Sequence, residues 1–467
     1  RASGGRRKDP VNRILTTPFP PAVDYRILPP DGLIEDARVR MPLSKSVANR
    51  ALILSALTPG APRPALPGCD DSRLLAEALD TLAATPRGAQ INLENDGTAM
   101  RFLTAYVAAT EGLEATLTGS ERMCARPIGQ LVTALRECGA DISYLGAEGF
   151  PPLAIKGRRL KGGHVTVDAT VSSQFVSALL MVAPTMTDGL DIELDGEPAS
   201  APYIALTLNM MEHRGVVADR APLSISVDRG AYRIAPDDAE GDWSAAAFFY
   251  ELTAISAGWI TLEGLNPASS QGDRAAAELF GRLGVITEPS EEVPGGIDLQ
   301  PSPEVFGRLD ADLIDTPDMA PSLVVACCTL GIPFRLTGLK NLAIKECNRL
   351  ETLKEEMLRL GCAIEVIRDF GLEWEGRRLP LHQLPVFDPR GDHRLAMALA
   401  PVAVLVPGIV IRDAGCVAKS YPGYWDALRA IGFKTLDPAD TAADAGDSKS
   451  DGMAADTQGS SNPLNTF

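Results

Sequence analysis

Six segments of the chain share one pattern of apolar and polar positions. In each, apolar residues recur at the three- and four-residue spacing of an amphipathic helix, a glycine follows, and a short β-branched segment comes next. The segments are residues 78–91, 131–142, 206–217, 278–286, 353–364 and 427–433, and their glycines are Gly88, Gly139, Gly215, Gly284, Gly361 and Gly432. The glycines lie about 50 to 80 residues apart, a longer spacing than that of short solenoid repeats. The pattern predicts six α/β units, three in each of two domains.

Short runs of Val, Ile and Leu bounded by proline or glycine lie between these units. Residues 152–157, 164–169, 189–194 and 222–228 are examples, and their composition is typical of strands. Helix–glycine–strand links are common, so the pattern predicts an α/β fold class with sheets covered by helices but identifies no family.

Length and hydropathy are consistent with this picture. A chain of 467 residues with 45% hydrophobic residues is longer than one core usually supports, so two large domains are expected. The longest apolar run, residues 401–411, is broken by Pro407 and Gly408 and is too short to span a bilayer.

The basic N-terminal segment lacks the apolar stretch of a secretory signal, and we interpret it as a loose arm. Residues 436–467 are rich in Asp, Ala, Ser and Gly and are predicted to be a disordered acidic tail.

Charge and cysteine usage narrow the class of protein. A formal net charge of −17 argues against nucleic acid or an anionic membrane as the partner. The eight cysteines have no C-x-x-C spacing and the four histidines are scattered, so we expect no metal site and a reduced cytoplasmic location.

Three segments in the first half of the chain combine a predicted helix start with polar or cationic side chains. They contain Lys45, Ser46 and Arg50, then Asn95, Gly97, Thr98 and Arg101, then Ser172, Ser173 and Gln174. Any one of them is more often an ordinary capped helix. Three together indicate helix N-termini that converge on an anion, because free N–H groups and the helix dipole favour negative charge.

An ordered set of short motifs between residues 43 and 425 resembles the EPSP synthases of the enolpyruvyl transferase family. The motifs are Lys45-Ser46-x-x-Asn49-Arg50, Asn95-x-Gly97-Thr98-Ala99-Met100-Arg101, Arg126-Pro127-Ile128, Ser172-Ser173-Gln174, Ser200-x-Pro202-Tyr203, Gly241-Asp242, Pro317-Asp318, Asn341, Lys345-Glu346-x-x-Arg349-Leu350, Asp392-His393-Arg394-x-Ala396-Met397 and Lys419-x-x-Pro422. Each motif alone is weak, whereas the ordered set is specific.

The resemblance implies an α/β fold (α+β in some schemes) with two domains, each of three similar α/β units, and an active site in the cleft between them. Residues 43–240 are expected to form an inserted N-terminal-type domain. Residues 1–42 together with 241–435 are expected to form the discontinuous C-terminal-type domain. Closure of the two domains would assemble the site and exclude water.

The resemblance also implies a reaction. The enolpyruvyl group of phosphoenolpyruvate is transferred to the 5-hydroxyl of shikimate 3-phosphate, giving 5-enolpyruvylshikimate 3-phosphate and phosphate on the route to chorismate and the aromatic amino acids. It implies no cofactor and no metal, and it suggests a cytoplasmic monomer with small-molecule substrates, independent of nucleic acid and membrane. Glyphosate is an inhibitor of the family.

Site residues follow from the same resemblance. Those expected to bind shikimate 3-phosphate are Lys45, Ser46, Arg50, Ser172, Ser173, Gln174, Ser200, Tyr203, Asp318, Asn341 and Lys345. Those expected to bind phosphoenolpyruvate are Lys45, Asn95, Gly97, Arg126, Gln174, Glu346, Arg349, Arg394 and Lys419, in keeping with the fit of guanidinium groups to carboxylate and phosphate. The catalytic residues are expected to be Lys45, Asp318 and Glu346. Asp318 would accept the 5-hydroxyl proton, Glu346 would exchange protons with the methylene carbon, and Lys45 would neutralise or protonate the leaving phosphate.

Some positions depart from the family pattern. Asp96 stands where a small residue is usual, and its carboxylate beside an anion site is expected to weaken phosphoenolpyruvate binding. Phe102 replaces a common proline, and Cys347-Asn348 replaces a usual Thr-Asp. None of these changes removes a group assigned to the chemistry.

Two alternatives stay open at this point. A UDP-GlcNAc enolpyruvyl transferase shares the fold and phosphoenolpyruvate, but its loop cysteine has a different spacing from that of Cys124 and Arg126. A binding protein of the same fold without catalysis is the second alternative, and the retained Lys45, Asp318 and Glu346 argue against it.

Overall fold

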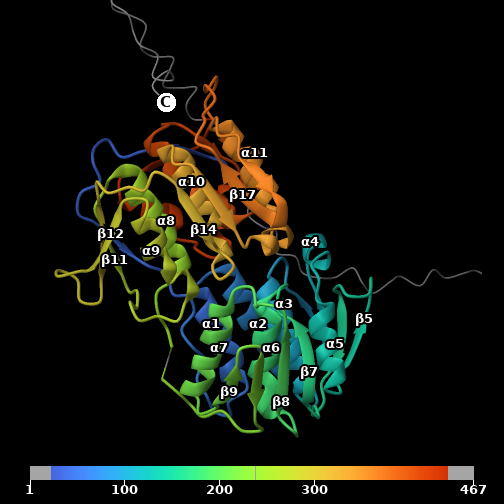
Figure 1. Cartoon of the computed structure of the whole chain (residues 1–467). Helices are drawn as coiled ribbons and strands as arrows, with labels where there is room; N and C mark the ends of the chain where they lie inside the picture. The colour runs from blue at the N-terminus through green and yellow to red at the C-terminus, as the bar shows by residue number, and fades with distance from the viewer. Residues whose placement is uncertain (1–22, 237, 440–467) are drawn as a thin grey trace, which may run out of the picture.

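The computed structural model describes residues 23–236 and 238–439. The predicted N-terminal arm and most of the predicted acidic tail lie outside these ranges. Within them the chain forms two lobes, each with its own hydrophobic core and with no core residue in common. Figure 1 draws one lobe above the other, with a blue N-terminal segment and the yellow-to-red part of the chain in the upper lobe and most of the blue and green chain below.

We call the two parts the outer lobe, residues 23–42 and 241–439, and the inserted lobe, residues 43–236 and 238–240. The core residues of the inserted lobe run from Val47 to Tyr232, and those of the outer lobe run from Ile27 to Met41 and from Trp243 to Phe433. The predicted domain bounds stay a prediction, because a folding unit is defined by more than its core.

The outer lobe contains three four-stranded sheets, with strand orders β18-β19-β1-β20, β12-β13-β11-β2 and β14-β15-β17-β16. The strands are β1 (Tyr25–Leu28), β2 (Ala37–Arg40), β11 (Ile260–Glu263), β12 (Val285–Pro289), β13 (Ile297–Pro301), β14 (Leu309–Asp312), β15 (Phe334–Thr337), β16 (Glu365–Ile367), β17 (Gly371–Trp374), β18 (Val386–Phe387), β19 (Val410–Ile411) and β20 (Lys434–Leu436). The helices are α8 (Trp243–Ser256), α9 (Ala276–Gly281), α10 (Ala320–Leu330), α11 (Arg349–Arg359), α12 (His393–Leu399) and α13 (Tyr424–Ala430). Short 3-10 helices η3 (Pro317–Met319), η4 (Lys340–Ile344) and η7 (Ala414–Lys419) carry residues that reach the cleft.

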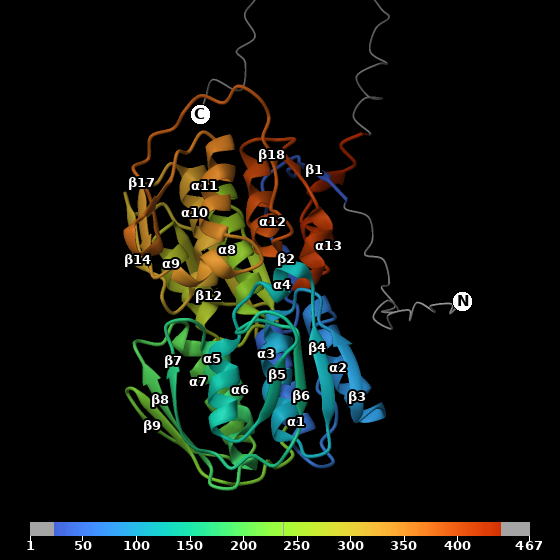
Figure 2. The ribbon, with the colours of Figure 1, turned by 90° about the vertical axis from the view of Figure 1, so that its right-hand side faces the viewer.

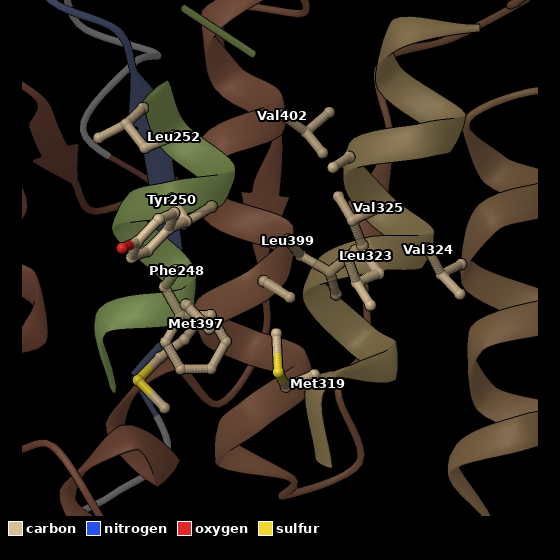
Figure 3. Packing of buried hydrophobic residues seen from close by; sticks show 14 of the residues in the cluster. Phe248, Tyr250, Leu252, Met319, Leu323, Val324, Val325, Met397, Leu399 and Val402 are labelled. Carbon is tan, nitrogen blue, oxygen red and sulfur yellow. The ribbon is translucent and has the colours of Figure 1, made fainter. Parts of the chain in front are cut away.

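The helices α8, α10 and α12 pack against one another in the middle of the outer lobe. Figure 3 shows Phe248 and Leu252 of α8, Leu323 of α10 and Leu399 of α12 around this core. These side chains are at most 3% exposed. Because α8 and α10 are apolar on nearly every face, they sit inside the lobe with helices and sheets around them.

The inserted lobe contains two four-stranded sheets in its described residues, with strand orders β3-β4-β6-β5 and β7-β8-β10-β9. The strands are β3 (Arg87–Asn92), β4 (Glu114–Thr118), β5 (Asp141–Tyr144), β6 (Leu153–Lys156), β7 (Gly163–Asp168), β8 (Leu190–Asp195), β9 (Ala218–Ala221) and β10 (Ser224–Val227). The helices are α1 (Lys45–Ala56), α2 (Asp70–Ala84), α3 (Gly97–Ala109), α4 (Glu121–Cys124), α5 (Gly129–Glu137), α6 (Ser173–Val182) and α7 (Ala201–His213). Helices α1 and α2 contact each other and α3. They form the third group of this lobe, without a sheet of their own among the described residues.

The six predicted helix–glycine–strand links are confirmed. All six glycines have positive φ, from 78° at Gly88 to 107° at Gly432, a region that favours glycine. The four strands expected between the units are also present, as β6, β7, β8 and β10. Gly88 lies at the start of β3 and Gly139 leads into β5, and these strands are the two edges of one sheet, so the six links serve five sheets.

The chain passes between the lobes at two adjacent points. Leu43 and Gly241 form an antiparallel bridge, and the amide of Asp242 donates to the carbonyl of Pro42 over 2.9 Å. This pairing directly precedes α1 in one segment and α8 in the other. It therefore fixes where the N-termini of these helices lie relative to the cleft. No helix in the described ranges is long and apolar enough to cross a bilayer.

Candidate active site

A pocket between the two lobes is lined by polar and charged side chains from both. Its lining residues include Lys45, Ser46, Asn49, Arg50, Thr98, Arg101, Arg126, Ser172, Ser173, Gln174, Ser200 and Tyr203 of the inserted lobe, and Asp318, Asn341, Lys345 and Arg394 of the outer lobe. Of the other predicted site residues, Gly97 is bonded to Arg101, Arg349 is paired with Asp318, and Glu346 is paired with Arg349. Lys419 contacts Glu346 and the Asn95 carbonyl beside the pocket. The structure thus brings the predicted site residues into one region, from segments far apart in the sequence.

The start of α1 places Lys45 at the cleft. The Ser44 side chain caps the helix by accepting from the amide of Val47, and the Lys45 amide donates to Asp242 over 3.1 Å. The Lys45 ammonium lies 2.9 Å from a carboxylate oxygen of Asp71. Burial alone would lower the pKa of Lys45, but the Asp71 carboxylate outweighs it and the net pKa is raised. Lys45 is therefore a fixed cation.

Asp71, in the first turn of α2, joins the two lobes. Its second oxygen lies 2.7 Å from the ammonium of Lys419, which also donates to the Asn95 carbonyl over 3.0 Å. Burial would raise the pKa of Asp71, but Lys419 and Lys45 hold it below its usual range. Two lysines from different lobes thus share one buried carboxylate.

Gly97 opens α3 next to two arginines. A Cβ on Gly97 would lie 2.7 Å from the guanidinium carbon of Arg126 and closer still to Arg101. Arg101 donates to the Gly97 carbonyl over 2.7 Å, and burial together with Arg126 lowers its pKa to about 9. Only glycine leaves room for both guanidinium groups at this helix start.

Arg349, the first residue of α11, is bound by three carboxylates. Its guanidinium lies 2.6 Å from Asp392, 2.6 Å from Asp318 and 2.9 Å from Glu346. It is 1% exposed, so a single cation holds two catalytic candidates and one fully buried aspartate in place.

Besides Arg349, two other cations lie close to the carboxylate of Asp318. It lies 3.3 Å from Lys345 and 3.4 Å from Arg394. Burial would raise the pKa of Asp318, but Arg394, Lys345 and Arg349 lower it well below its usual range. Glu346 has its pKa lowered in the same way, chiefly by Arg349 and Lys419. Both groups are ionised near neutral pH.

The other side of the pocket is formed by α6 and α7. Ser172 caps α6 by accepting from the Gln174 amide over 3.2 Å, and the Gln174 side chain donates to Thr98 over 3.0 Å. Ser200 has φ of 60°, and its amide donates to the carbonyl of Ile314 in the outer lobe over 2.8 Å. The Tyr203 hydroxyl donates to Asp273 over 3.5 Å. Both α6 and α7 therefore begin at the pocket.

Most of the N–H donors of Arg50 are bonded to groups in the pocket wall. It donates to Thr207, the Ser46 carbonyl, Ser177 and the Tyr203 carbonyl. A guanidinium has five N–H donors, so these four bonds leave one for a ligand. Burial lowers the pKa of Arg50 to about 10, and it is still charged at neutral pH.

The lobes are in direct contact along the cleft. Arg122 of α4 donates to the Lys345 carbonyl over 2.8 Å. Both ribbon views place α4 at the boundary between the lobes (Figures 1 and 2). With the Lys419–Asp71 pair, these contacts hold the pocket walls together.

Many buried polar atoms at the cleft have no hydrogen-bond partner among the described residues. They are Asn49 Nδ2, Asn95 Oδ1, Asp96 Oδ2, Arg101 Nε, Arg126 Nε and NH1, Asp273 Oδ1, Asn341 Oδ1 and both ring nitrogens of His393. Such atoms are normally paired in a folded protein. Their concentration here indicates a site for a polar ligand, and the excess of lysine and arginine in the pocket indicates an anion.

Asp71, Asp273 and Asp392 contribute to the site but were not predicted from the sequence. In the sequence, Asp71 cannot be told apart from the acidic residues that are common in the first turn of a helix. Asp392 stands two residues before Arg394 in the Asp-His-Arg motif, and this motif was its only signal in the sequence. Within residues 23–236 and 238–439, no three His, Cys, Asp or Glu side chains are arranged to hold a metal ion.

Comparisons with known proteins agree with the motifs. Residues 70–428 match the family model described as EPSP synthase (3-phosphoshikimate 1-carboxyvinyltransferase). A protein of Bacteroides fragilis with the name 3-phosphoshikimate 1-carboxyvinyltransferase is 47% identical over 400 residues, which cover 85% of this chain and 95% of the relative. A protein of the same name from Methanoculleus marisnigri is 34% identical over 420 residues, covering 85% and 97%. Among solved structures, EPSP synthase of Acinetobacter baumannii matches with a TM-score of 0.69 at 20% identity, over 89% of this chain and 100% of that chain, which supports the same fold.

Proposed function

The chain belongs to the EPSP synthase family, and on this basis we propose how its cleft binds its substrates and moves protons. The reaction is the transfer of the enolpyruvyl group of phosphoenolpyruvate to the 5-hydroxyl of shikimate 3-phosphate, with release of phosphate. It is a step of the shikimate pathway. The observation that carries the proposal is the cluster of cations and unpartnered polar atoms that both lobes direct into one pocket.

Shikimate 3-phosphate would bind against α6 and α7. Ser172, Ser173, Ser200 and Lys45 supply hydroxyl and cationic donors for its phosphate. Arg50 contributes its one remaining N–H, and Tyr203 lies beside the ring. Asn341 and Lys345 would hold the ring hydroxyls from the outer lobe, close to Asp318.

Phosphoenolpyruvate would bind against α3 and the cationic groups of the outer lobe. Arg126 has two unpartnered nitrogens beside Gly97, which suits a phosphate or carboxylate. Lys419 and Lys45 are held beside the same region by their ion pairs with Asp71. Arg349 and Arg394 are held there by their ion pairs with Asp318. Gln174 lies between the two substrate regions.

Substrate binding would change which cations surround the Asp318 carboxylate. The Asp318 carboxylate shares Arg349, Arg394 and Lys345, which keeps its pKa low and makes it a weak base. An anionic substrate that takes over Arg394 and part of Arg349 raises the pKa of Asp318. Asp318 then becomes able to accept the 5-hydroxyl proton at the moment when both substrates are present.

Two further groups complete the proton transfers. In the free cleft Glu346 is ionised, and an anionic substrate that takes over Lys419 and part of Arg349 would raise its pKa so that it takes up a proton from water. Glu346 would then deliver this proton to the methylene carbon of phosphoenolpyruvate, which makes the neighbouring carbon electrophilic toward the 5-hydroxyl oxygen. It would then take a proton back as the carbon–oxygen bond to phosphate breaks. Lys45 would neutralise the leaving phosphate. Since Glu346 and Asp318 are both held by Arg349, their titrations are coupled.

The enzyme is proposed to work as a monomer in the cytoplasm. All eight cysteines lie in the described residues and are free thiols, which supports a reducing compartment. Each lobe has its own hydrophobic core.

A phosphate-release assay tests the function. Purified protein with phosphoenolpyruvate and shikimate 3-phosphate should release phosphate, and omission of the acceptor or the change Lys45→Met should abolish release. UDP-GlcNAc in place of shikimate 3-phosphate tests the related transferase. Release with UDP-GlcNAc alone would overturn the proposal. Tight binding of shikimate 3-phosphate without any release would favour the idle binding protein.

A further inference from the structure

The carboxyl group of Asp96 occupies the N-terminus of α3. Its Oδ1 accepts from the amides of Thr98 and Ala99 over 2.9 and 3.0 Å, so it caps the helix that faces the proposed phosphoenolpyruvate region. Its Oδ2 is buried and has no partner among the described residues. Asp96 as a whole is 1% exposed. A half-satisfied buried carboxyl group at an anion site is unusual, because either a partner or a proton is normally required.

Charged groups face Asp96 from several elements. Asp71 on α2 raises its pKa, while Lys419 on η7 and Lys45 on α1 lower it. Arg101 faces it from α3 itself. Glu346, before α11, and His393, on α12, both interact with Lys419.

Asp96 differs from its neighbours in its protonation near neutral pH. Burial, followed by Asp71, raises the pKa of Asp96 to about 7. The pKa values of Asp71 and Glu346 are lowered, so both stay ionised. Burial lowers the pKa of His393 well below its usual value, so its ring stays neutral. Asp273, whose pKa is also raised by burial, contacts Ser244 and Tyr203 on the side proposed for shikimate 3-phosphate.

We propose that Asp96 is a specificity-determining residue for phosphoenolpyruvate, whose carboxyl group admits this anion when protonated and opposes it when ionised. The neutral carboxyl keeps Oδ1 as the helix cap and turns Oδ2 into a donor that can bind an anion. The ionised carboxyl places a negative charge at the N-terminus of α3, where the helix dipole would otherwise favour the substrate. This inference rests on the proposed function of the cleft.

The inference predicts how the KM for phosphoenolpyruvate changes with pH. With a pKa of about 7 for Asp96, and substrate admitted only by the protonated carboxyl, KM in the wild type should rise by roughly 25-fold between about pH 6.5 and pH 8.5, since one ionisation changes affinity at most tenfold per pH unit. Asp96→Asn keeps an oxygen to cap α3 but cannot ionise, so its KM should stay nearly flat over this range. The phosphate of the substrate also titrates, and the ratio of the two KM values at each pH removes that contribution.

A matched control uses the nearby carboxylate of Glu94. This side chain accepts from Asn92 and lies two residues before Asp96, outside the pocket. Glu94→Gln should keep the pH profile of the wild type. The change in Asp96→Asn should fall on the KM for phosphoenolpyruvate, with the KM for shikimate 3-phosphate showing the same profile in all three proteins.

The measurement is the steady-state KM for both substrates at five pH values in the three proteins, with thermal unfolding as a check of folding. Parallel profiles of wild type and Asp96→Asn would overturn the inference while leaving the function intact. A loss of kcat and of thermal stability at every pH, without a change in slope, would also overturn it and assign Asp96 a capping role alone. Absence of turnover in all three proteins would instead overturn the proposed function.

Discussion

The carboxylate of Asp318 lies 2.6 Å from the guanidinium of Arg349, and the two come from different segments of the outer lobe, η3 and the start of α11. Arg349 also holds Glu346 and Asp392. One buried cation therefore contacts both carboxylates proposed for proton transfer, and it is one of the cations that hold their pKa values low.

Replacing Asp318 with asparagine tests its role as the base. Asp318→Asn preserves shape but cannot accept a proton, so kcat should fall by about 10²- to 10⁴-fold, the usual range for a general base. The KM values should change much less. Steady-state phosphate release measures both, and a kcat within about threefold of the wild type would show that another group takes the proton.

Gly97→Ala tests the close approach of the arginines to α3. The added Cβ would meet Arg126 at 2.7 Å and Arg101 more closely still, so at least one guanidinium must move. The KM for phosphoenolpyruvate should rise by about tenfold or more, since loss of one charge-assisted contact costs about 1.5–3 kcal/mol. Binding of shikimate 3-phosphate alone, followed by calorimetry, should be unchanged. An unaltered KM would contradict this placement of the anion.

Asp71→Asn tests the carboxylate shared by two lysines. Removing one partner of a buried ion pair is expected to lower the free energy of unfolding by about 3 kcal/mol, because Lys45 and Lys419 are left facing each other. Added inorganic phosphate should then raise the melting temperature more in the variant than in the wild type, since an anion replaces the lost carboxylate. An equal shift in both proteins would count against an anion site between these lysines.

The buried carboxyl group of Glu251 should make folding stability depend on pH, an effect unrelated to catalysis. It lies on α8 inside the outer core, neither of its oxygens has a partner among the described residues, and burial raises its pKa well above the usual value. The folded state therefore holds a proton that the unfolded state releases above about pH 4.3, so stability falls as pH rises by up to about 1.4 kcal/mol per pH unit. Glu251→Gln should match the wild type near pH 4 and become more stable than it toward pH 8, as measured by urea unfolding. A difference that does not depend on pH would contradict the buried neutral acid.

The sequence predicts the local features of this fold well. Five of the six glycines lie just beyond a helix end, where positive φ is a local requirement, while Gly88 lies within β3. The helix starts at Lys45, Gly97 and Ser173 follow from local capping. The number of sheets was harder to predict, because β3 and β5 belong to one sheet through pairing with β4, which lies between them in the sequence, and β6, which follows both.

The site was predictable where motifs exist and hidden where it depends on long-range pairs. Arg349 and Lys419 stand in recognisable motifs, but their partners Asp392 and Asp71 are 43 and 348 residues away in sequence. Charge partners at such separations leave no spacing signal in a single sequence. Asp96 is the reverse case, because its departure from the family pattern is visible in the sequence while its cap and its unpartnered oxygen are visible only in three dimensions.

The most direct test of the account is to run the reaction in D₂O and follow it by proton NMR. Transient protonation of the methylene carbon by Glu346 predicts an enolpyruvyl ether of shikimate 3-phosphate with deuterium in its methylene group, formed together with phosphate. Glu346→Gln should lose this incorporation and turnover together. Phosphate without an enolpyruvyl ether, or an ether free of deuterium, would contradict the addition–elimination mechanism assigned to this cleft.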